Sequence, residues 1–196
     1  GVDPPDTAHV VIAQNKATSA WFALPLLPLL IAQGLRVRRI TPRLPEPDGE
    51  RDGVFGAGPD LGLLILGDSA AAGVGALHQQ DALAGQLVRQ LAPNFRVRWH
   101  LRARTGDDSS HALARLRAEP ELRCDVAITS LGVNDITAGM RCARFLALQT
   151  QILDHLQQHC GARQVLVYGL PPVRAFPAQP QPLRWAMGQR ARRFDA

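Results

Sequence analysis

Residues 61–69 read Leu-Gly-Leu-Leu-Ile-Leu-Gly-Asp-Ser, and this stretch decides the fold. A short apolar run that ends at a turn, as residues 61–66 do, is typical of a buried strand in a parallel sheet. The small residues that follow, at 70–75, permit a tight turn from strand into helix. Such a turn places the hydroxyl of Ser69 at the carboxyl end of a strand, where open α/β sheets bind ligands, and beside the positive end of a helix dipole. Ser69 is therefore a candidate nucleophile.

Two further short segments follow later apolar runs in the same way. Residues 104–108 read Arg-Thr-Gly-Asp-Asp after the second candidate strand, and residues 132–135 read Gly-Val-Asn-Asp after the third. Taken alone, each is also what an ordinary turn or helix cap looks like, because Gly, Asp, Ser and Asn are common there. Their order, each at the end of a strand, favours one shared site.

With these three motifs in this order, the chain resembles the SGNH, or GDSL-type, serine hydrolases from about residue 61 to residue 168. The resemblance implies that Ser69 is the nucleophile. It also implies an oxyanion hole made by the backbone N–H groups of Ser69 and Gly106 and the side-chain amide of Asn134. The residue types suit these roles, because glycine lets a backbone N–H approach a ligand closely and an asparagine amide donates without carrying charge.

The resemblance has one departure, which concerns the base. The family's fourth motif, D-x-x-H, supplies a histidine and its aspartate, but no histidine follows Gly169 here. We expect the base to lie beyond Ala196, because the three preceding motifs are intact. The in-chain alternative is His111 in the literal D-x-x-H of residues 108–111, which the sequence predicts as the start of a helix capped by Asp108 or Ser109.

The aspartates and the remaining histidines are given structural roles. Asp68 and Asp135 are expected to brace their loops, with helix capping as the alternative for Asp135. His155 and His159 lie one helical turn apart, a spacing that suits a metal ion. Their Gln and Asp neighbours indicate a solvated helix face instead, so we expect no metal.

Composition narrows the class of protein. The 196 residues are 46% hydrophobic, which suffices for one domain of ordinary size plus an extension. The net charge of +5 is carried almost wholly by arginine, because Lys16 is the only lysine. A basic balance can attract nucleic acid or anionic membranes. No nucleic-acid motif or aromatic-interleaved basic patch is present, so we expect no nucleic-acid partner.

The number of cysteines indicates whether the protein resides in a reducing or an oxidising compartment. The three cysteines, an odd number, argue against a disulfide framework. Cys124 opens an apolar strand and is predicted to be a packing residue. A reducing compartment fits best, and we expect a cytoplasmic protein.

The first 60 residues differ from the rest and are predicted as an N-terminal extension ahead of an SGNH-hydrolase-like domain at 61–196, which we expect to be incomplete at its C-terminal end. Residues 21–32 are almost wholly apolar but shorter than the roughly 20 residues of a membrane span, and they lack the marks of a signal peptide. They are predicted either to make a peripheral membrane contact or to pack over the core. Residues 41–60, rich in Pro, Gly and Asp, predict a linker.

From residue 61 onward, strands and helices alternate. Strands are predicted over residues 61–66, 95–102, 125–130 and 164–168, and helices over 81–91, 109–118 and 137–159. The period-two pattern of residues 95–102 indicates one wet face and a place near a sheet edge. The fold class is therefore α/β, a three-layer α/β/α sandwich with a mostly parallel sheet of the SGNH-hydrolase, flavodoxin-like kind. The resemblance implies five strands, of which the sequence predicts four.

The expected function is a serine hydrolase that cleaves carboxylic or thio esters of small molecules through an acyl-enzyme on Ser69, with no metal or organic cofactor. The proline-rich residues 171–182 cannot form a regular helix, and Phe176, Leu183 and Trp185 line an acyl pocket there or belong to a surface loop.

Two other functions compete with the hydrolase. One is a non-catalytic binding module that lacks the base. The other is nucleotide binding at the glycine-rich residues 67–75. These residues lack the Lys-Ser/Thr of a phosphate loop, and the dinucleotide-binding pattern G-x-G-x-x-G, started at Gly73, has His78 in place of its last glycine.

Overall fold

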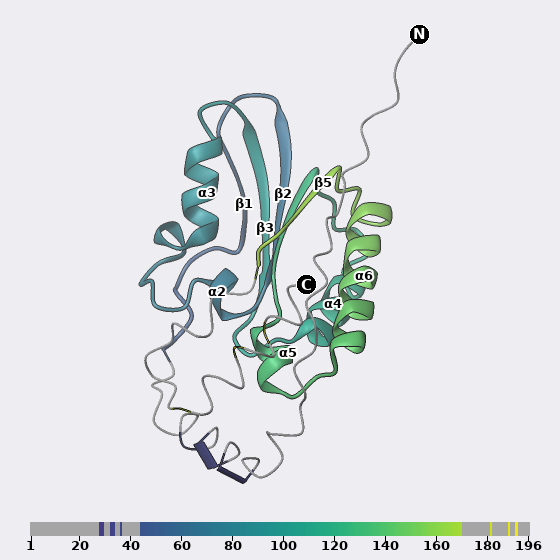
Figure 1. Ribbon diagram of the computed structural model, residues 1–196. Coiled ribbons are helices and arrows are strands. Elements are labelled where there is room, and N and C mark those ends of the chain that lie inside the picture. Colours follow the sequence, from purple (N-terminus) through teal and green to yellow (C-terminus); the bar gives the residue numbers. More distant parts are fainter. Residues whose placement is uncertain are drawn as a thin grey trace.

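The computed structural model describes residues 44–169 without a gap, together with Pro28, Leu29, Ala32, Gln33, Arg36, Gln181, Gly188 and Ala191. Within this part, five strands form one sheet with helices on both faces (Figure 1). The strands are β1 (Asp52–Phe55), β2 (Asp60–Gly67), β3 (Arg96–Ala103), β4 (Val126–Ser130) and β5 (Gln164–Val167). The helices are α2 (Ser69–Ala72), the 3₁₀-helix η2 (Gln79–Asp81), α3 (Leu83–Leu91), α4 (Ser109–Arg117), α5 (Val133–Thr137) and α6 (Cys142–Gln158).

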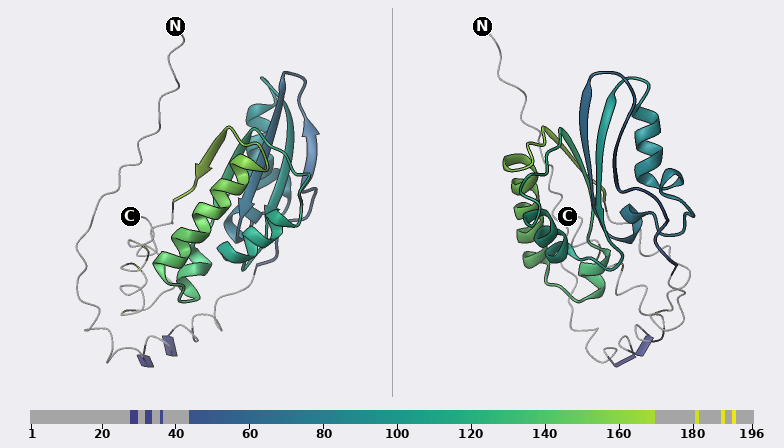
Figure 2. Two further views of the ribbon diagram at one scale, coloured as in Figure 1. Left: turned by 90° about the vertical axis from the view of Figure 1, so that its right-hand side faces the viewer. Right: turned by 180° about the vertical axis from the view of Figure 1, so that it is seen from behind.

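The strand order is β1-β3-β2-β4-β5, and every neighbouring pair is parallel except β1 with β3. Helices α2 and α3 cover one face of this sheet, and α4 and α6 cover the other (Figure 2). The predicted three-layer α/β/α sandwich with a mostly parallel sheet is confirmed.

The central strand β2 explains why its sequence is continuously apolar. Leu64 and Leu66 pack into the core beneath α4 and α6, whereas Leu63 and Ile65 pack beneath α2 and α3. All four side chains are at most 1% exposed. A strand buried on both faces has no wet side on which polar residues would alternate, which is the pattern the sequence showed.

The first strand was not predicted. It lies inside residues 41–60, which the sequence predicted as a linker, and it pairs antiparallel with β3. The prediction that β3 lies near a sheet edge is confirmed, because only β1 lies outside it. The polar side chains on one face of β3 form ion pairs with this edge strand: Asp52 of β1 binds His100 at 2.6 Å and Arg102 at 2.8 Å.

The long helix predicted over residues 137–159 corresponds to α6, which begins five residues later, at Cys142. Helix α5 ends at Thr137, and Gly139 then adopts a φ of +81°, a left-handed conformation that interrupts a helix. Helix α6 buries the predicted apolar stripe: Ile152 and Leu156 pack against the sheet, whereas Phe145 packs against Ile136 of α5, and all three are at most 6% exposed.

Several predictions fall on residues that the structure does not describe. These include the apolar stretch 21–32 apart from Pro28, Leu29 and Ala32, and the proline-rich stretch 171–182 apart from Gln181, with the pocket candidates Phe176, Leu183 and Trp185. In the described part of the chain, no helix combines the length and the apolar character that crossing a membrane requires.

Candidate active site

The turn between β2 and α2 carries Ser69. Gly67 is required there because a Cβ at this position would lie 2.6 Å from both the Ser130 carbonyl oxygen and the Cβ of Ala71. The next residue, Asp68, caps α2 by accepting a 3.0 Å hydrogen bond from the Ala70 N–H. Ser69 begins α2 half-buried, and no hydrogen bond to its hydroxyl is formed within the described part of the chain.

The cap residue Asp68 is only 4% exposed. Burial raises the pKa of its carboxyl, and the nearby carboxylates Asp135 and Asp107 raise it further, against the lowering effect of the Ala70 N–H. Asp68 thus holds the turn in shape rather than facing solvent, as the sequence predicted for a bracing residue.

The second motif forms a loop at the end of β3. Gly106 has a φ of +90°, and a Cβ there would meet nothing within 4 Å. Backbone conformation rather than crowding therefore selects glycine. The Arg104 N–H donates to the Gly67 carbonyl at 3.2 Å, so this loop is hydrogen-bonded directly to the end of β2, beside Ser69.

The third motif reaches the second through Asn134, on α5. Its side-chain Nδ2 donates to the backbone carbonyl of Asp107 at 2.8 Å. An amide nitrogen carries two hydrogens, so the second N–H of Asn134 is left for another acceptor. In Figure 1, α2 and α5 both lie at the lower end of the sheet, where the parallel strands end. The loops carrying Ser69, Gly106 and Asn134 therefore lie together at the end of the sheet where the parallel strands end.

Asp135 joins the same two loops a second time. Its carboxylate is fully buried and accepts hydrogen bonds from the Ser109 N–H at 3.1 Å and from the Ser109 hydroxyl at 3.0 Å. The Ser109 hydroxyl accepts in turn from Nε2 of Gln149 on α6 at 2.8 Å. Burial raises the pKa of Asp135, while the bonds from Ser109 oppose that rise. Bracing, the first of the two roles expected for Asp135, is what these contacts provide.

Gln149 was missed from the sequence, although a signal was present. It lies four residues after Phe145 and three before Ile152, on the apolar stripe of α6. A polar residue in such a stripe indicates a buried hydrogen-bond partner, since an unpaired polar group there would be destabilising.

The literal D-x-x-H segment forms the predicted helix start. Asp108 caps α4 by accepting from the N–H groups of Ser110 and His111, which confirms one of the two predicted caps. Its carboxylate also binds Nδ1 of His111 at 2.8 Å. Burial raises the pKa of Asp108, but these hydrogen bonds outweigh it and hold the pKa below its ordinary value. His111 is 69% exposed at the side chain, and no hydrogen bond to Ser69 is formed.

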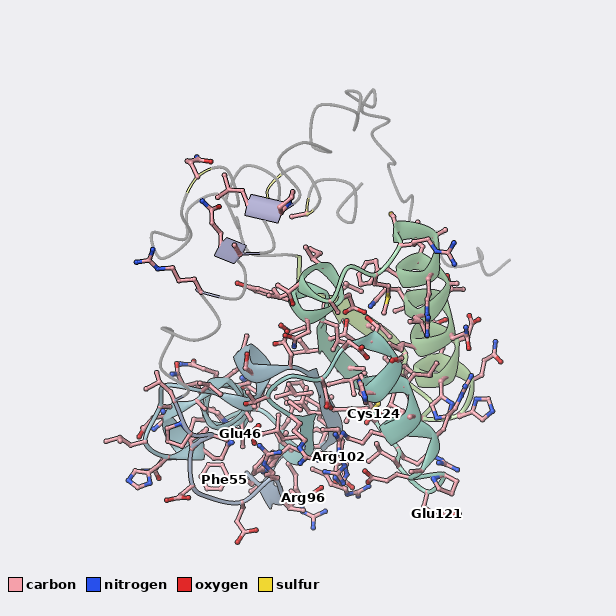
Figure 3. The ribbon with its side chains drawn as sticks, turned by 90° about the horizontal axis from the view of Figure 1, so that it is seen from below. Glu46, Phe55, Arg96, Arg102, Glu121 and Cys124 are labelled. Carbon is pink, nitrogen blue, oxygen red and sulfur yellow. The ribbon has the colours of Figure 1, made fainter. Side chains whose placement is uncertain are left out.

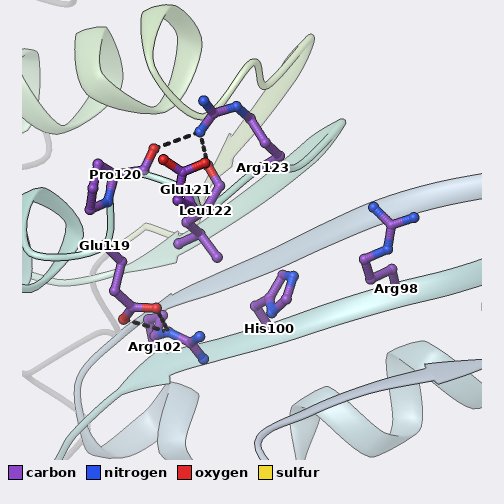
Figure 4. Close-up of a pocket in the computed structure, with 8 residues that line it drawn as sticks. All are labelled: Arg98, His100, Arg102, Glu119, Pro120, Glu121, Leu122 and Arg123. Atoms are coloured by element: carbon purple, nitrogen blue, oxygen red, sulfur yellow. Dashed lines mark hydrogen bonds and ion pairs between the residues drawn. The ribbon is translucent and has the colours of Figure 1, made fainter.

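Polar side chains also gather away from this edge of the sheet. A cavity of about 560 Å³ lies between β3 and the loop after α4, lined by Arg98, His100, Arg102 and residues 119–123 (Figure 4). It contains none of the three predicted site residues, and Arg102 is already paired with Glu119 at 2.7 Å. The rings of His155 and His159 stack at 4.6 Å. Within the residues described, no three His, Cys, Asp or Glu side chains gather as a metal site would require.

Comparison with known proteins found solved structures with the same fold. Among solved structures, TesA is 26% identical, with 66% of this chain and 69% of TesA covered and a TM-score of 0.52. A mutant of the esterase AlinE4 is 25% identical, with 71% and 69% covered and a TM-score of 0.54. Axe2, an acetylxylan esterase from Geobacillus stearothermophilus, is 17% identical, with 70% and 71% covered and a TM-score of 0.52, and shows the fold alone.

No curated protein sequence matches the chain. The sequence model of the GDSL-like lipase/acylhydrolase family, however, matches residues 65–196, two thirds of the chain and all three motifs. This chain therefore belongs to the GDSL-like lipase/acylhydrolase family.

Proposed function

We propose that this chain cleaves carboxylic or thio esters of small molecules through an acyl-enzyme on Ser69. Membership of a family of ester hydrolases supports the reaction class. The observation that carries the proposal is the 2.8 Å hydrogen bond from Asn134 to the Asp107 carbonyl, because it holds the two motif loops that follow Ser69 at the same edge of the sheet.

In the proposed first step, the Ser69 oxygen forms a bond to the acyl carbon as the carbonyl π electrons move to oxygen. The resulting oxyanion accepts hydrogen bonds from the N–H of Ser69, the N–H of Gly106 and the second N–H of Asn134. Fixed donors of this kind are worth roughly 2.7–4 kcal/mol each in comparable hydrolases. The oxyanion then collapses, and the alcohol or thiol leaves with a proton. Water attacks the acyl group and releases the acid, which returns the hydroxyl to Ser69.

A base must take the proton of Ser69 and return it to the leaving group. No histidine bonds to Ser69 within the described part of the chain, and the fourth family motif has no counterpart after Gly169. The second candidate function is therefore a binding module that holds an acyl ester without turning it over. His111, which Asp108 already orients at 2.8 Å, is the in-chain candidate for the base.

Hydrolysis of p-nitrophenyl acetate by the full chain separates these proposals. We expect Ser69→Ala to abolish turnover and Thr150→Ala, which removes an exposed hydroxyl from α6, to leave it unchanged. Turnover that also disappears in His111→Ala would identify the in-chain base. Equal turnover by the wild type and Ser69→Ala would overturn the hydrolase proposal. A wild type that binds the ester without hydrolysing it would favour either the binding module or a hydrolase whose base lies beyond Ala196, as the sequence predicts.

A further inference from the structure

A short segment upstream of the family match contacts the Gly106 loop. Residues 44–51 precede β1, and the match to the family begins only at residue 65. Oε1 of Glu46 accepts a 2.6 Å hydrogen bond from the backbone N–H of Thr105, the residue before Gly106. Figure 3 looks onto this edge of the molecule and labels Glu46.

Arg51 completes the contact from the same segment. Its Nη2 pairs with Oε2 of Glu46 at 2.6 Å, and its Nη1 donates to the carbonyl oxygen of Ala103 at 2.7 Å. The Glu46–Arg51 pair thus binds the loop at two points, one at the end of β3 and one immediately before Gly106. Both side chains are about one-third exposed or less.

Residues 104–106 are held by hydrogen bonds rather than by packing. Arg104, Thr105 and Gly106 are all exposed, and a Cβ at Gly106 would have no neighbour within 4 Å. The direction of an N–H in such a loop depends on the hydrogen bonds of the adjoining peptides. A carboxylate accepting from a backbone N–H is one of the stronger hydrogen bonds available.

Arg51 also removes an electrostatic difficulty. A lone carboxylate close to the loop would disfavour a negative oxygen at Gly106, and the guanidinium at 2.6 Å neutralises it. Partial burial raises the pKa of Glu46, but the Thr105 N–H and Arg51 outweigh burial and hold that pKa below its ordinary value. Glu46 therefore stays ionised, and able to accept, at neutral pH.

We propose that Glu46, oriented by Arg51, is a positioning residue that fixes the Gly106 N–H for the oxyanion. This role rests on the proposed function, whereas the structural coupling between Glu46 and Gly106 does not. The segment before residue 61, predicted as an extension and linker, would then supply part of the support of the active site.

The experiment compares three variants of the full chain with the wild type. Glu46→Ala removes the acceptor, Glu46→Gln keeps an oxygen that can accept from Thr105, and Glu50→Ala removes an exposed carboxylate of the same segment. We expect Glu46→Ala to lower kcat for p-nitrophenyl acetate about three- to tenfold with KM little changed, as loss of one hydrogen bond that matters in the transition state would do. Glu46→Gln should recover most of that loss, and Glu50→Ala should behave as wild type.

A second readout does not require turnover. In ¹⁵N–¹H correlation spectra, the backbone amide signals of Thr105 and Gly106 should shift and broaden in Glu46→Ala and not in Glu50→Ala. Unchanged signals in Glu46→Ala would overturn the proposal. So would a loss of kcat in Glu46→Ala that Glu46→Gln does not recover while both melt at the wild-type temperature. If the wild type itself proves inactive, the failure concerns the hydrolase activity of this chain, and the amide signals still decide whether Glu46 orders the loop.

Discussion

The side-chain amide of Asn134 and the backbone carbonyl of Asp107 are joined by a hydrogen bond of 2.8 Å, which links the third motif to the second. This bond uses one amide hydrogen and thereby fixes the direction of the other. It also explains why an amide and not a carboxylate is needed at position 134. An aspartate would have no hydrogen to offer, and it would place a negative charge beside both the Asp107 carbonyl and the proposed oxyanion.

The first prediction follows for Asn134→Ala. Loss of one oxyanion donor should reduce kcat for p-nitrophenyl acetate by about 10²–10³, with KM little changed. Steady-state kinetics beside Gln157→Ala, an exposed amide on α6, provides the control. A loss of less than about threefold in Asn134→Ala would remove Asn134 from the oxyanion hole.

The second prediction compares two glycines. Gly106 and Gly139 have φ values of +90° and +81°, and neither would crowd a Cβ. An alanine at either position should destabilise the fold by about 1–2 kcal/mol, because the left-handed conformation is costly for it. Only Gly106→Ala should also lower kcat, since relaxation of its φ turns the N–H away. Urea unfolding and ester hydrolysis measure the two effects, and equal activity of both variants would contradict the role of Gly106.

The third prediction concerns acid. Partial burial raises the pKa of Asp52, but the hydrogen bonds and charges of His100 and Arg102 outweigh it and hold the pKa below its ordinary value of 3.8. The folded state therefore gains stability from ionised Asp52 above about pH 4 and loses it as the pH falls through the folded pKa. The difference in unfolding free energy between wild type and Asp52→Asn should be largest near pH 6 and shrink by pH 3. Urea titrations of these proteins and of Asp154→Asn, an exposed control, test this, and a pH-independent difference would contradict it.

The fourth prediction concerns the three thiols. Burial, reinforced by Cys160 and Asp125, raises the pKa of Cys124 to about 12, and burial also raises the pKa of Cys160. Thiolates are the reactive form, so neither residue should react with a disulfide reagent at pH 8 in the native state. Cys142, half-buried at the start of α6, should give the rapid signal. Persistence of that signal in Cys142→Ser would show that the buried thiols are accessible.

The sequence predicted the elements that carry strong local patterns. The apolar run of β2 and the helical stripe of α6 could be predicted because each pattern is formed by residues close together in the sequence. The break at Gly139 was not predicted, since a single glycine inside a helical pattern is often tolerated.

What the sequence left unpredicted depends on distant partners. Strand β1 has four residues with no clear alternation, and its pairing with β3 joins positions more than 40 residues apart. The contact between Glu46 and Thr105 is of the same kind, separated by 59 positions. No pattern of neighbouring residues indicates the β1–β3 pairing or the contact between Glu46 and Thr105. The local pattern made Ser69 a candidate nucleophile, whereas the roles of Gly106 and Asn134 came from the family resemblance, and all three are predictions for the experiments above.

The antiparallel direction of β1 has a consequence for how the chain is connected. A parallel strand at this edge would bring its preceding segment to the end of the sheet opposite Ser69. Because β1 runs the other way, Asp52 pairs with His100 near the end of β3, and residues 44–51 reach the fold beside the motif loops. The described segment that begins at Leu44 therefore enters the fold beside the candidate active site. For protein engineering, a domain inserted directly before Leu44 would be a neighbour of the candidate active site, whereas one inserted after Arg117, at the opposite end of α4 from Asp108, would be held away from it.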